Sequence, residues 1–131
     1  RITCGEIKMN SKQKGDISVG EAISHFLKRE QEVLLPIGDK RPYDLVVEKN
    51  GLLQKVQCKF TDSKTSYGIF TVDLRLTGGN QSFHTVKYYG SNDFDVLFVC
   101  TSSGDKYEIP ASETNKSTIN LGKKFAKFRI V

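Results

Sequence analysis

The sequence lacks the cysteine pairs of a zinc site and the long hydrophobic runs of a membrane protein. Its three cysteines are Cys4, Cys58 and Cys100, and none of them has a CxxC partner. Cys58 and Cys100 lie within apolar runs, which is typical of small buried side chains. No segment reaches the roughly 18 apolar residues of a membrane-spanning helix, and no secretory signal pattern opens the chain. We therefore expect a soluble, cytoplasmic protein with reduced thiols.

The chain also has no internal repeat, low-complexity tract or linker. Its 131 residues, 37% of them hydrophobic, are enough for one compact domain with its own core. The only methionine, Met9, stands just before the first helical pattern, so we expect residues 1–8 to be an extension outside the fold and residues 9–131 to form the domain. Twenty Lys and Arg against fifteen Asp and Glu give a net charge of +5, which favours a polyanionic partner.

Hydrophobic periodicity predicts one helix followed by short strands. Apolar residues recur at helical spacing from Val19 to Leu27, with Ser11 as the expected N-cap, and the pattern ends near Glu30. The expected strands span residues 32–35, 44–48, 55–60, 67–76, 95–100, 107–109 and 123–131. The strand of residues 67–76 belongs to a polar-faced ribbon that is expected over residues 65–89. This order predicts an α+β fold in which the helix packs on a mixed or mostly antiparallel sheet.

The runs on either side of Asn50-Gly51 predict a hairpin that gathers polar side chains. Asn and Gly tolerate the positive φ angles of a tight turn, so the two runs should pair antiparallel. Side chains two positions apart share a face of a strand, which places Gln57 beside Lys59. Asp44 stands early in the first run and Lys59 late in the second, so antiparallel pairing brings these two residues close together.

A carboxylate, an amide and a lysine at one point of a sheet suit the hydrolysis of a phosphodiester. That reaction needs a cation, an activated water and help for the departing oxygen. Magnesium prefers oxygen ligands, and we expect Asp44, the amide oxygen of Gln57 and the backbone carbonyl of Cys58 to hold it. Lys59 would either orient or deprotonate the attacking water, or stabilise the developing charge, and the sequence leaves both roles open.

Glu21 is a further candidate, because it follows Gly20 at the boundary of the apolar face of the helix. A carboxylate there would reach the hairpin as a catalytic residue and an outer metal ligand. The alternative is an exposed helix carboxylate. A strand with Asp, Gln and Lys on one face is itself more often an ordinary solvated surface, but here the apolar flanks indicate central strands, which favours a catalytic site.

These residues resemble the PD-(D/E)XK nuclease superfamily. The likeness is carried by Gly20-Glu21 in an N-terminal helix, Pro42-Tyr43-Asp44 on a strand and Gln57-Cys58-Lys59 on the next strand. With residues 95–99 and 107–110 included, the chain after Met9 is similar to the bacterial intron-encoded homing branch of that class. The resemblance implies a restriction-endonuclease-like core and Mg²⁺-dependent hydrolysis of double-stranded DNA, with Mn²⁺ as a substitute. It also implies a homotetramer on a long specific target.

Gln57 departs from the resemblance, since the superfamily usually has Glu or Asp at this place. An amide keeps the ligating oxygen but loses a negative charge. We therefore expect a lower metal affinity and a stronger dependence on Asp44 and Lys59.

The predicted protruding ribbon is the best candidate for DNA recognition, because the major groove admits a two-stranded ribbon. The alternative is an extended hairpin or an oligomer contact. Basic residues elsewhere would contact phosphates, which position the DNA without specifying its sequence. The expected contacts are Arg75, Asn80, Gln81, His84 and Lys87 in the ribbon, and Lys12, Lys14, Lys40, Arg41 and Lys64 outside it.

The sequence therefore predicts a site-specific DNA endonuclease of the homing type. One chain carries one site, so a double-strand break requires at least a dimer. Two alternatives stay open. One is a Holliday-junction resolvase with the same core, and the other is a non-catalytic DNA-binding module that kept the fold.

Overall fold

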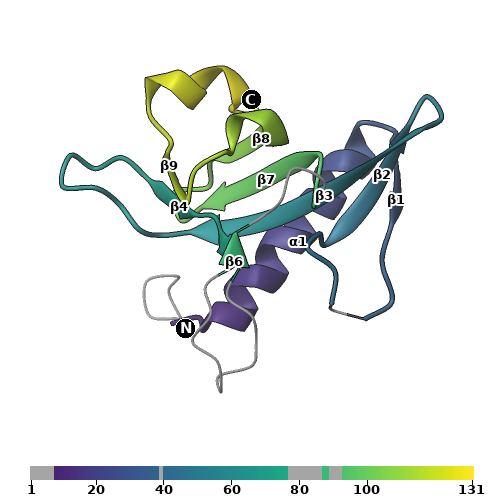
Figure 1. Cartoon of the computed structure of the whole chain (residues 1–131), viewed down its shortest axis with the longest axis horizontal. Coiled ribbons are helices and arrows are strands. Elements are labelled where there is room, and N and C mark those ends of the chain that lie inside the picture. The colour runs from purple at the N-terminus through teal and green to yellow at the C-terminus, as the bar shows by residue number, and fades with distance from the viewer. Residues whose placement is uncertain (1–7, 39, 77–86, 89–92) are drawn as a thin grey trace, which may run out of the picture.

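A mixed five-stranded sheet forms the centre of the molecule in the computed structural model, which describes residues 8–38, 40–76, 87–88 and 93–131. Helix α1 covers one face of the sheet, and short C-terminal elements cover the other (Figure 1). This arrangement confirms the predicted α+β class with an N-terminal helix on a mixed sheet. No helix in the described part of the chain is long and apolar enough to cross a membrane. Residues 1–7 of the expected extension lie outside the described residues.

Helix α1 spans Ser11–Lys28, and its N-cap is Asn10 rather than the predicted Ser11. The Asn10 side chain accepts a hydrogen bond from the Gln13 N–H, and the Gln13 side chain accepts one from the Asn10 N–H, both at 2.9 Å. This reciprocal capping box satisfies two backbone donors. Ser11 as the cap would have put Lys14 in the reciprocal position, and an ammonium group cannot accept the return hydrogen bond.

The strand order of the sheet is β1-β2-β3-β7-β8, with β3 and β7 parallel and the other neighbouring pairs antiparallel. Asn50 and Gly51 join β2 to β3 with φ angles of 53° and 82°, so the predicted tight turn is confirmed. The register places Leu45 opposite Val56. The strands are β1 (Glu32–Leu34), β2 (Leu45–Lys49), β3 (Leu52–Thr61), β7 (Val96–Thr101) and β8 (Lys106–Pro110).

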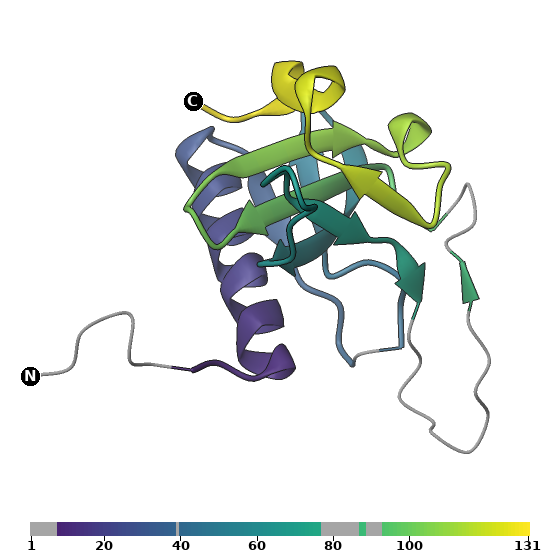
Figure 2. The ribbon, with the colours of Figure 1, turned by 90° about the vertical axis from the view of Figure 1, so that its left-hand side faces the viewer.

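Helix α1 packs against the sheet through one stripe of its surface. Ser18, Ala22 and Phe26 are buried, and their spacing of four keeps them on one side of the helix. Ala22 and Phe26 meet side chains from the central strands, and Figure 2 shows the helix lying along that side of the sheet. The helix-face core also contains Leu45, Val47, Val56, Cys58, Val96, Phe98 and Cys100.

Two short strands and two helical turns cover the opposite face. β4 (Thr71–Asp73) pairs antiparallel with β9 (Thr118–Asn120), and η2 (Ala111–Glu113) and η3 (Lys123–Phe128) complete this cover. The strands of the sheet send alternate residues into the two cores, as a period of two requires. The C-terminal core contains Val72, Leu74, Phe94, Leu97, Val99, Tyr107, Ile109, Ile119, Leu121 and Phe125.

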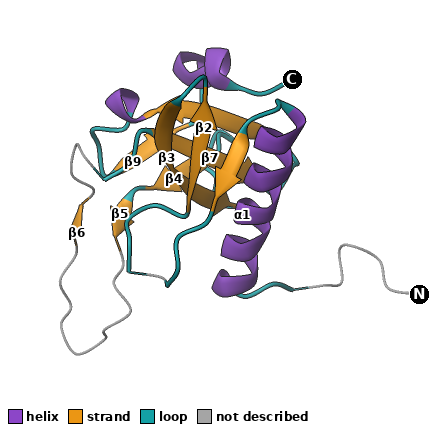
Figure 3. Ribbon diagram, turned by 90° about the vertical axis from the view of Figure 1, so that its right-hand side faces the viewer, coloured by secondary structure: helices purple, strands orange, loops and turns teal. Residues whose placement is uncertain are grey.

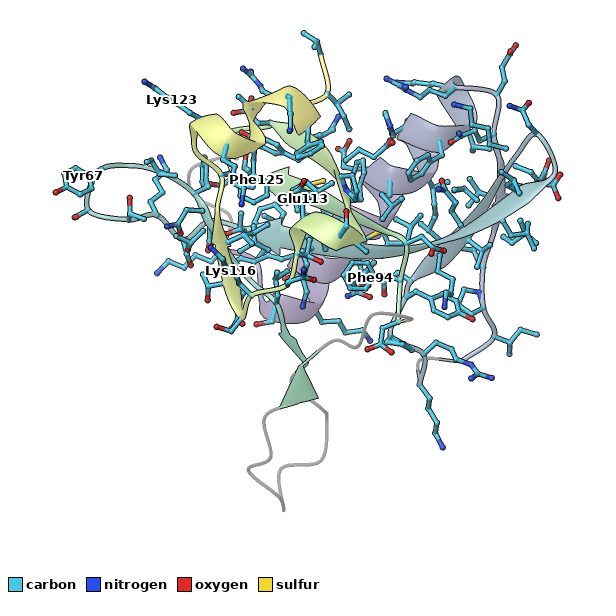
Figure 4. All side chains as sticks on the ribbon, turned by 45° about the horizontal axis from the view of Figure 1, so that its top comes forward. Tyr67, Phe94, Glu113, Lys116, Lys123 and Phe125 are labelled. Carbon is cyan, nitrogen blue, oxygen red and sulfur yellow. The ribbon has the colours of Figure 1, made fainter. Side chains whose placement is uncertain are left out.

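The predicted strand over residues 123–131 is wrong. These residues form the 3-10 helix η3, followed by an isolated bridge from Arg129 to Tyr107. Phe125 and Phe128 are three positions apart, which is one turn of a 3-10 helix, so both pack against the C-terminal core. Figure 4 shows Phe125 directed inward and Lys123 directed away from the body. An alternation of lysine and phenylalanine therefore fits this helix as well as a strand.

The ribbon is shorter than the alternating run of residues 67–76 predicts. Lys64 and Phe70 form a bridge that closes a small loop, and Thr71–Asp73 pairs with β9 and not with the ribbon. Beyond it, β5 (Arg75–Leu76) pairs with β6 (Lys87–Tyr88) as a projecting ribbon (Figure 3). Alternation predicts an extended chain but does not identify its partner strand. Residues 77–86 lie outside the described residues.

Candidate active site

The candidate site lies where β2 begins beside β3. Asp44 immediately precedes β2, and its backbone N–H donates to the Val56 carbonyl at 2.8 Å. Its carboxylate Oδ2 accepts a hydrogen bond from the Cys58 N–H, also at 2.8 Å. The carboxylate thus replaces the backbone acceptor that a longer β2 would have offered. The sheet therefore holds Asp44 in place from both its backbone and its side chain.

The backbone carbonyl of Cys58 lies near the Asp44 carboxylate and is directed to the same side of β3. Val56 and Cys58 are two positions apart, so both direct their backbone groups toward β2, which begins only at Leu45. The side-chain amide of Gln57 donates from Nε2 to the Cys58 carbonyl at 3.4 Å. The carboxylate of Asp44, the amide of Gln57 and the carbonyl of Cys58 therefore converge.

Gln57 and Lys59 lie on the face of the sheet opposite α1. Their neighbours on β7 are Leu97 and Val99, which belong to the C-terminal core. Gln57 is buried, and Lys59 is half-buried in the wall of an open pocket of about 540 Å³. The shared face that the period of two predicts is thus present. The other residues that line this pocket are Ser11, Phe60, Thr61, Asp62, Ser63, Thr71, Val72, Asp73 and Thr118.

Burial acts against the charges of Asp44 and Lys59. It raises the pKa of Asp44, while the hydrogen bond from Cys58 and the positive charge of Lys59 oppose this rise. Burial also lowers the pKa of Lys59, while the charges of Asp73 and Asp44 oppose that change. Asp44 and Lys59 are thus partly shielded from water, and each favours the charged form of the other. Such opposed effects on pKa values are frequent at functional sites.

Cys58 offers its backbone and not its thiol. Its side chain lies in the helix-face core, where burial raises the pKa of the thiol far above its usual range. Cys100 lies in the same core, and burial raises its pKa to about 12. Both thiols therefore stay protonated, and a protonated thiol is a poor metal ligand. The interpretation of both cysteines as buried apolar side chains is confirmed, which leaves the Cys58 carbonyl as the group available at the site.

The sequence of residues 9–129 matches the family model described as PD-(D/E)XK endonuclease. The chain belongs to the PD-(D/E)XK endonuclease family. The structure of a bacterial homing endonuclease, I-Ssp6803I, is similar to that of this endonuclease, with a TM-score of 0.78 and 31% sequence identity over 92% of this chain and 89% of the other. No curated protein sequence matches the chain. The predicted family and its restriction-endonuclease-like core are thus confirmed.

PD-(D/E)XK endonucleases generally use divalent metal ions, and the oxygen atoms at the site suit one. Within the residues that the structure describes, no three His, Cys, Asp or Glu side chains are grouped as a metal cluster. A metal ion here would therefore rely on the Asp44 carboxylate, with the Gln57 amide and the Cys58 carbonyl. Mg²⁺ commonly takes one or two carboxylates and completes its shell with water and substrate phosphate, so this donor set fits it.

The endonuclease structure does not bring Glu21 to this cluster. Helix α1 lies on the other face of the sheet, and Glu21 Oε2 pairs with Lys106 Nζ at 2.9 Å. One turn along the helix, His25 Nε2 pairs with Glu108 Oε1 at 2.9 Å. These adjoining pairs tie α1 to β8. That Glu21 binds the metal stays a prediction, and Glu21 is not part of the site proposed below.

The expected DNA contacts of the endonuclease lie on several surfaces. Lys14 forms an ion pair with Asp62 at 2.7 Å. Arg75 and Lys87 lie on the two strands of the β5–β6 ribbon. Asn80, Gln81 and His84 lie outside the described residues. The remaining expected contacts are exposed, and they are Lys12, Lys40, Arg41 and Lys64.

Asp73 is a residue of this region that sequence reasoning missed. It stands in the alternating run that predicts the ribbon, whereas the structure places it on β4, in the pocket wall beside Lys59. A signal was present in the sequence, because Asp73 lies between the apolar residues Val72 and Leu74, both of which are buried. That pattern indicates an outward-facing carboxylate on a strand that packs on a core.

Proposed function

We propose that this endonuclease is a site-specific nuclease of the homing type, which hydrolyses both strands of DNA with Mg²⁺ as its cofactor and Mn²⁺ as a substitute. The observation that carries the proposal is the convergence of the Asp44 carboxylate, the Gln57 amide and the Cys58 carbonyl. The charge of Lys59 acts on Asp44 at the same place. Similarity to a bacterial homing endonuclease supports DNA as the substrate.

Asp44 is the anionic ligand of the proposed ion. Gln57 Nε2 faces the Cys58 carbonyl, and turning the amide over would place Oε1 there instead. Two acceptor oxygens repel each other unless a cation or donor lies between them, so a bound ion favours the turned amide. When bound, the ion neutralises negative charge that develops on the scissile phosphate.

Lys59 supplies a positive charge beside the reacting phosphate. In the hydrolysis, a water oxygen bonds to phosphorus and the bond from phosphorus to the leaving sugar oxygen breaks. The water loses a proton, and the leaving oxygen gains one. A protonated Lys59 stabilises the transition-state charge, and a neutral Lys59 accepts the proton of the water. Burial lowers the pKa of Lys59, which makes the neutral form more accessible than in an exposed lysine.

The proposed enzyme works as an oligomer. Each chain carries one such site, so cutting two strands requires at least two copies. A single small module buries on the order of 600–1,000 Å² of its own surface against DNA, so a long target argues for more copies, and the family resemblance implies a tetramer. The β5–β6 ribbon is the proposed recognition element. The basic residues outside it are proposed phosphate contacts.

The test is cleavage of plasmids that carry candidate intron insertion sites. We expect a linear product in Mg²⁺, and binding without cleavage in Ca²⁺. Absence of cleavage on every site, with either Mg²⁺ or Mn²⁺, would contradict the proposal. A four-way junction competing with the linear site distinguishes a resolvase, which would prefer the junction.

Two variants test the site itself. Asp44→Asn and Lys59→Met should each lower the single-turnover cleavage rate by about 10²- to 10³-fold, because each removes a charge at the reacting phosphate. The matched controls are Glu48→Gln and Lys49→Met, which are exposed on the neighbouring β2 and should stay within about twofold of wild type. Cleavage that survives both site variants would leave only a DNA-binding function for these residues.

A further inference from the structure

Strand β4 folds back over the end of β3 and brings a second carboxylate to the pocket of Lys59. The Thr61 hydroxyl donates to the Thr71 carbonyl, and the Thr71 N–H donates to the Ser63 carbonyl at 2.9 Å. Two positions further along β4, Asp73 lines the same pocket as Lys59. The position of Asp73 is therefore set by hydrogen bonds between β4 and the end of β3, the strand that carries Lys59.

The backbone of Asp73 is held on its other side as well. β4 pairs with β9, and Asp73 stands opposite Thr118, which also lines the pocket. Val72 and Leu74 are only 1% and 2% exposed in the C-terminal core. Because side chains alternate along a strand, the carboxylate of Asp73 points away from that core. A side chain on a paired strand is held in position more precisely than a side chain on a loop.

Lys59 needs such a partner when the metal is bound. The other carboxylate whose charge acts on Lys59 is Asp44, which the proposed function assigns to the metal ion. A ligand that has given its charge to a cation attracts a lysine much less. Asp73 lies on a different strand and outside the metal ligands, so its charge remains directed at the lysine.

Asp62 lines the same pocket but does not have this role. Its carboxylate pairs with Lys14 at 2.7 Å, and this hydrogen bond lowers the pKa of Asp62. Its charge is thereby matched by a lysine of helix α1. The pocket therefore holds two exposed aspartates, one of them paired with the helix and the other placed beside Lys59 on β4.

We propose that Asp73 is a positioning residue, which holds the ammonium group of Lys59 at the place where the scissile phosphate binds. This inference rests on the proposed function and adds a residue to the same site. Asp73 contacts neither the metal nor the phosphate in this proposal. It acts through Lys59.

Asp73→Asn should slow single-turnover cleavage about 10- to 100-fold at saturating enzyme, since misplacement of a catalytic group by about 1 Å has effects of this size. DNA affinity in Ca²⁺ should change less than about threefold, because the loss is in the reaction and not in binding. Asp73→Glu should restore part of the rate. Asp62→Asn, the matched control in the same pocket, should cleave within about threefold of wild type.

A second measurement does not depend on cleavage. The relaxation of the Lys59 side-chain Cε–Nζ group by NMR should show greater mobility in Asp73→Asn and no change in Asp62→Asn. Wild-type rates in Asp73→Asn, equal losses in both variants, or unchanged Lys59 mobility would each overturn the inference. Failure of the wild-type protein to cut any DNA would instead overturn the proposed function, and the mobility measurement would still decide the role of Asp73.

Discussion

On the helix face of the sheet, the polar side chains at the edge of the core pair with one another. Glu21 with Lys106 and His25 with Glu108 form two adjoining pairs between α1 and β8. On the opposite face, Asp44 and Lys59 lie partly buried. Burial raises the pKa of Asp44 and lowers the pKa of Lys59, and both shifts favour the neutral forms. The first face compensates its polar groups within the protein alone. On the second face the charges of Asp44, Lys59 and Asp73 act on one another, and in the proposed function a cation and a phosphate would add to this compensation.

This difference separates stability from function. Burying a charge costs free energy unless partners compensate it, whereas exposed ion pairs cost and contribute little. The helix face therefore stabilises the fold mainly through apolar burial. The opposite face gives up some stability for its chemistry. Substitutions on the two faces should consequently change different observables.

Phe26→Ala should have the largest effect on stability. Phe26 is 2% exposed in the helix-face core, and its ring lies 6.0 Å from that of Phe98. Its truncation should lower the free energy of unfolding by about 3–5 kcal/mol, measured by denaturant titration. Cleavage per folded molecule should stay within about threefold of wild type, because the site lies across the sheet.

Leu27→Ala is the matched control for this substitution. Leu27 follows Phe26 on the same helix but is 55% exposed, so its truncation should change the free energy of unfolding by less than about 0.5 kcal/mol. If Phe26→Ala abolished cleavage in folded protein, the two faces would not be separable.

Asp44→Asn should raise stability while it slows cleavage. Burial raises the pKa of Asp44 above its ordinary 3.8. A raised carboxyl pKa contributes stability that is present below the unfolded value and is lost as the pH rises through the folded value, so the ionised group destabilises the fold at neutral pH. We expect a gain on the order of 0.5–1 kcal/mol at pH 7 without metal, measured by thermal unfolding. The asparagine can still accept the hydrogen bond from Cys58.

The gain should disappear at low pH, where the wild-type carboxyl is also neutral. Glu48→Gln, an exposed change on the adjoining strand, should show neither the gain nor its pH dependence. A loss of stability in Asp44→Asn would mean that the charge of Asp44 supports the fold, which would contradict the contrast between the two faces.

The hairpin of the site could be predicted from the sequence because its determinants are local. Asn50-Gly51 sets the turn, and the turn together with the alternation sets the register that brings Asp44 to Gln57 and Lys59. A period of two then fixes which side chains share a face. The candidate cluster follows from a few neighbouring residues, so the sequence motif and the observed geometry agree.

The partners of the other residues are not local, so local patterns in the sequence did not predict them. Asp73 reaches Lys59 only because β4 pairs with β9, a strand that no pattern in the sequence predicted. The side on which Glu21 lies depends on how α1 docks on the sheet, which local periodicity does not define. The alternation of residues 123–128 fits a strand and a 3-10 helix equally, and packing of Phe125 decided between them.

Glu21→Gln should have the smallest effect. Glu21 and Lys106 are both more than a third exposed, so loss of their ion pair should lower the free energy of unfolding by about 0.2–1 kcal/mol. The cleavage rate should stay within about threefold, because the carboxylate lies on the helix face. A loss of about 100-fold with unchanged stability would show instead that Glu21 acts at the metal, as its place at the boundary of the apolar helix face predicts.

The pH dependence of this small effect identifies the pair. The hydrogen bond to Glu21 raises the pKa of Lys106 above 10.5. A raised lysine pKa contributes stability that is fully present below the unfolded value and is lost as the pH rises through the folded one. The difference in stability between wild type and Glu21→Gln should therefore stay constant between about pH 7 and 9 and shrink above pH 10.5. A difference that persists at high pH would mean that Glu21 stabilises α1 by packing and not by its charge.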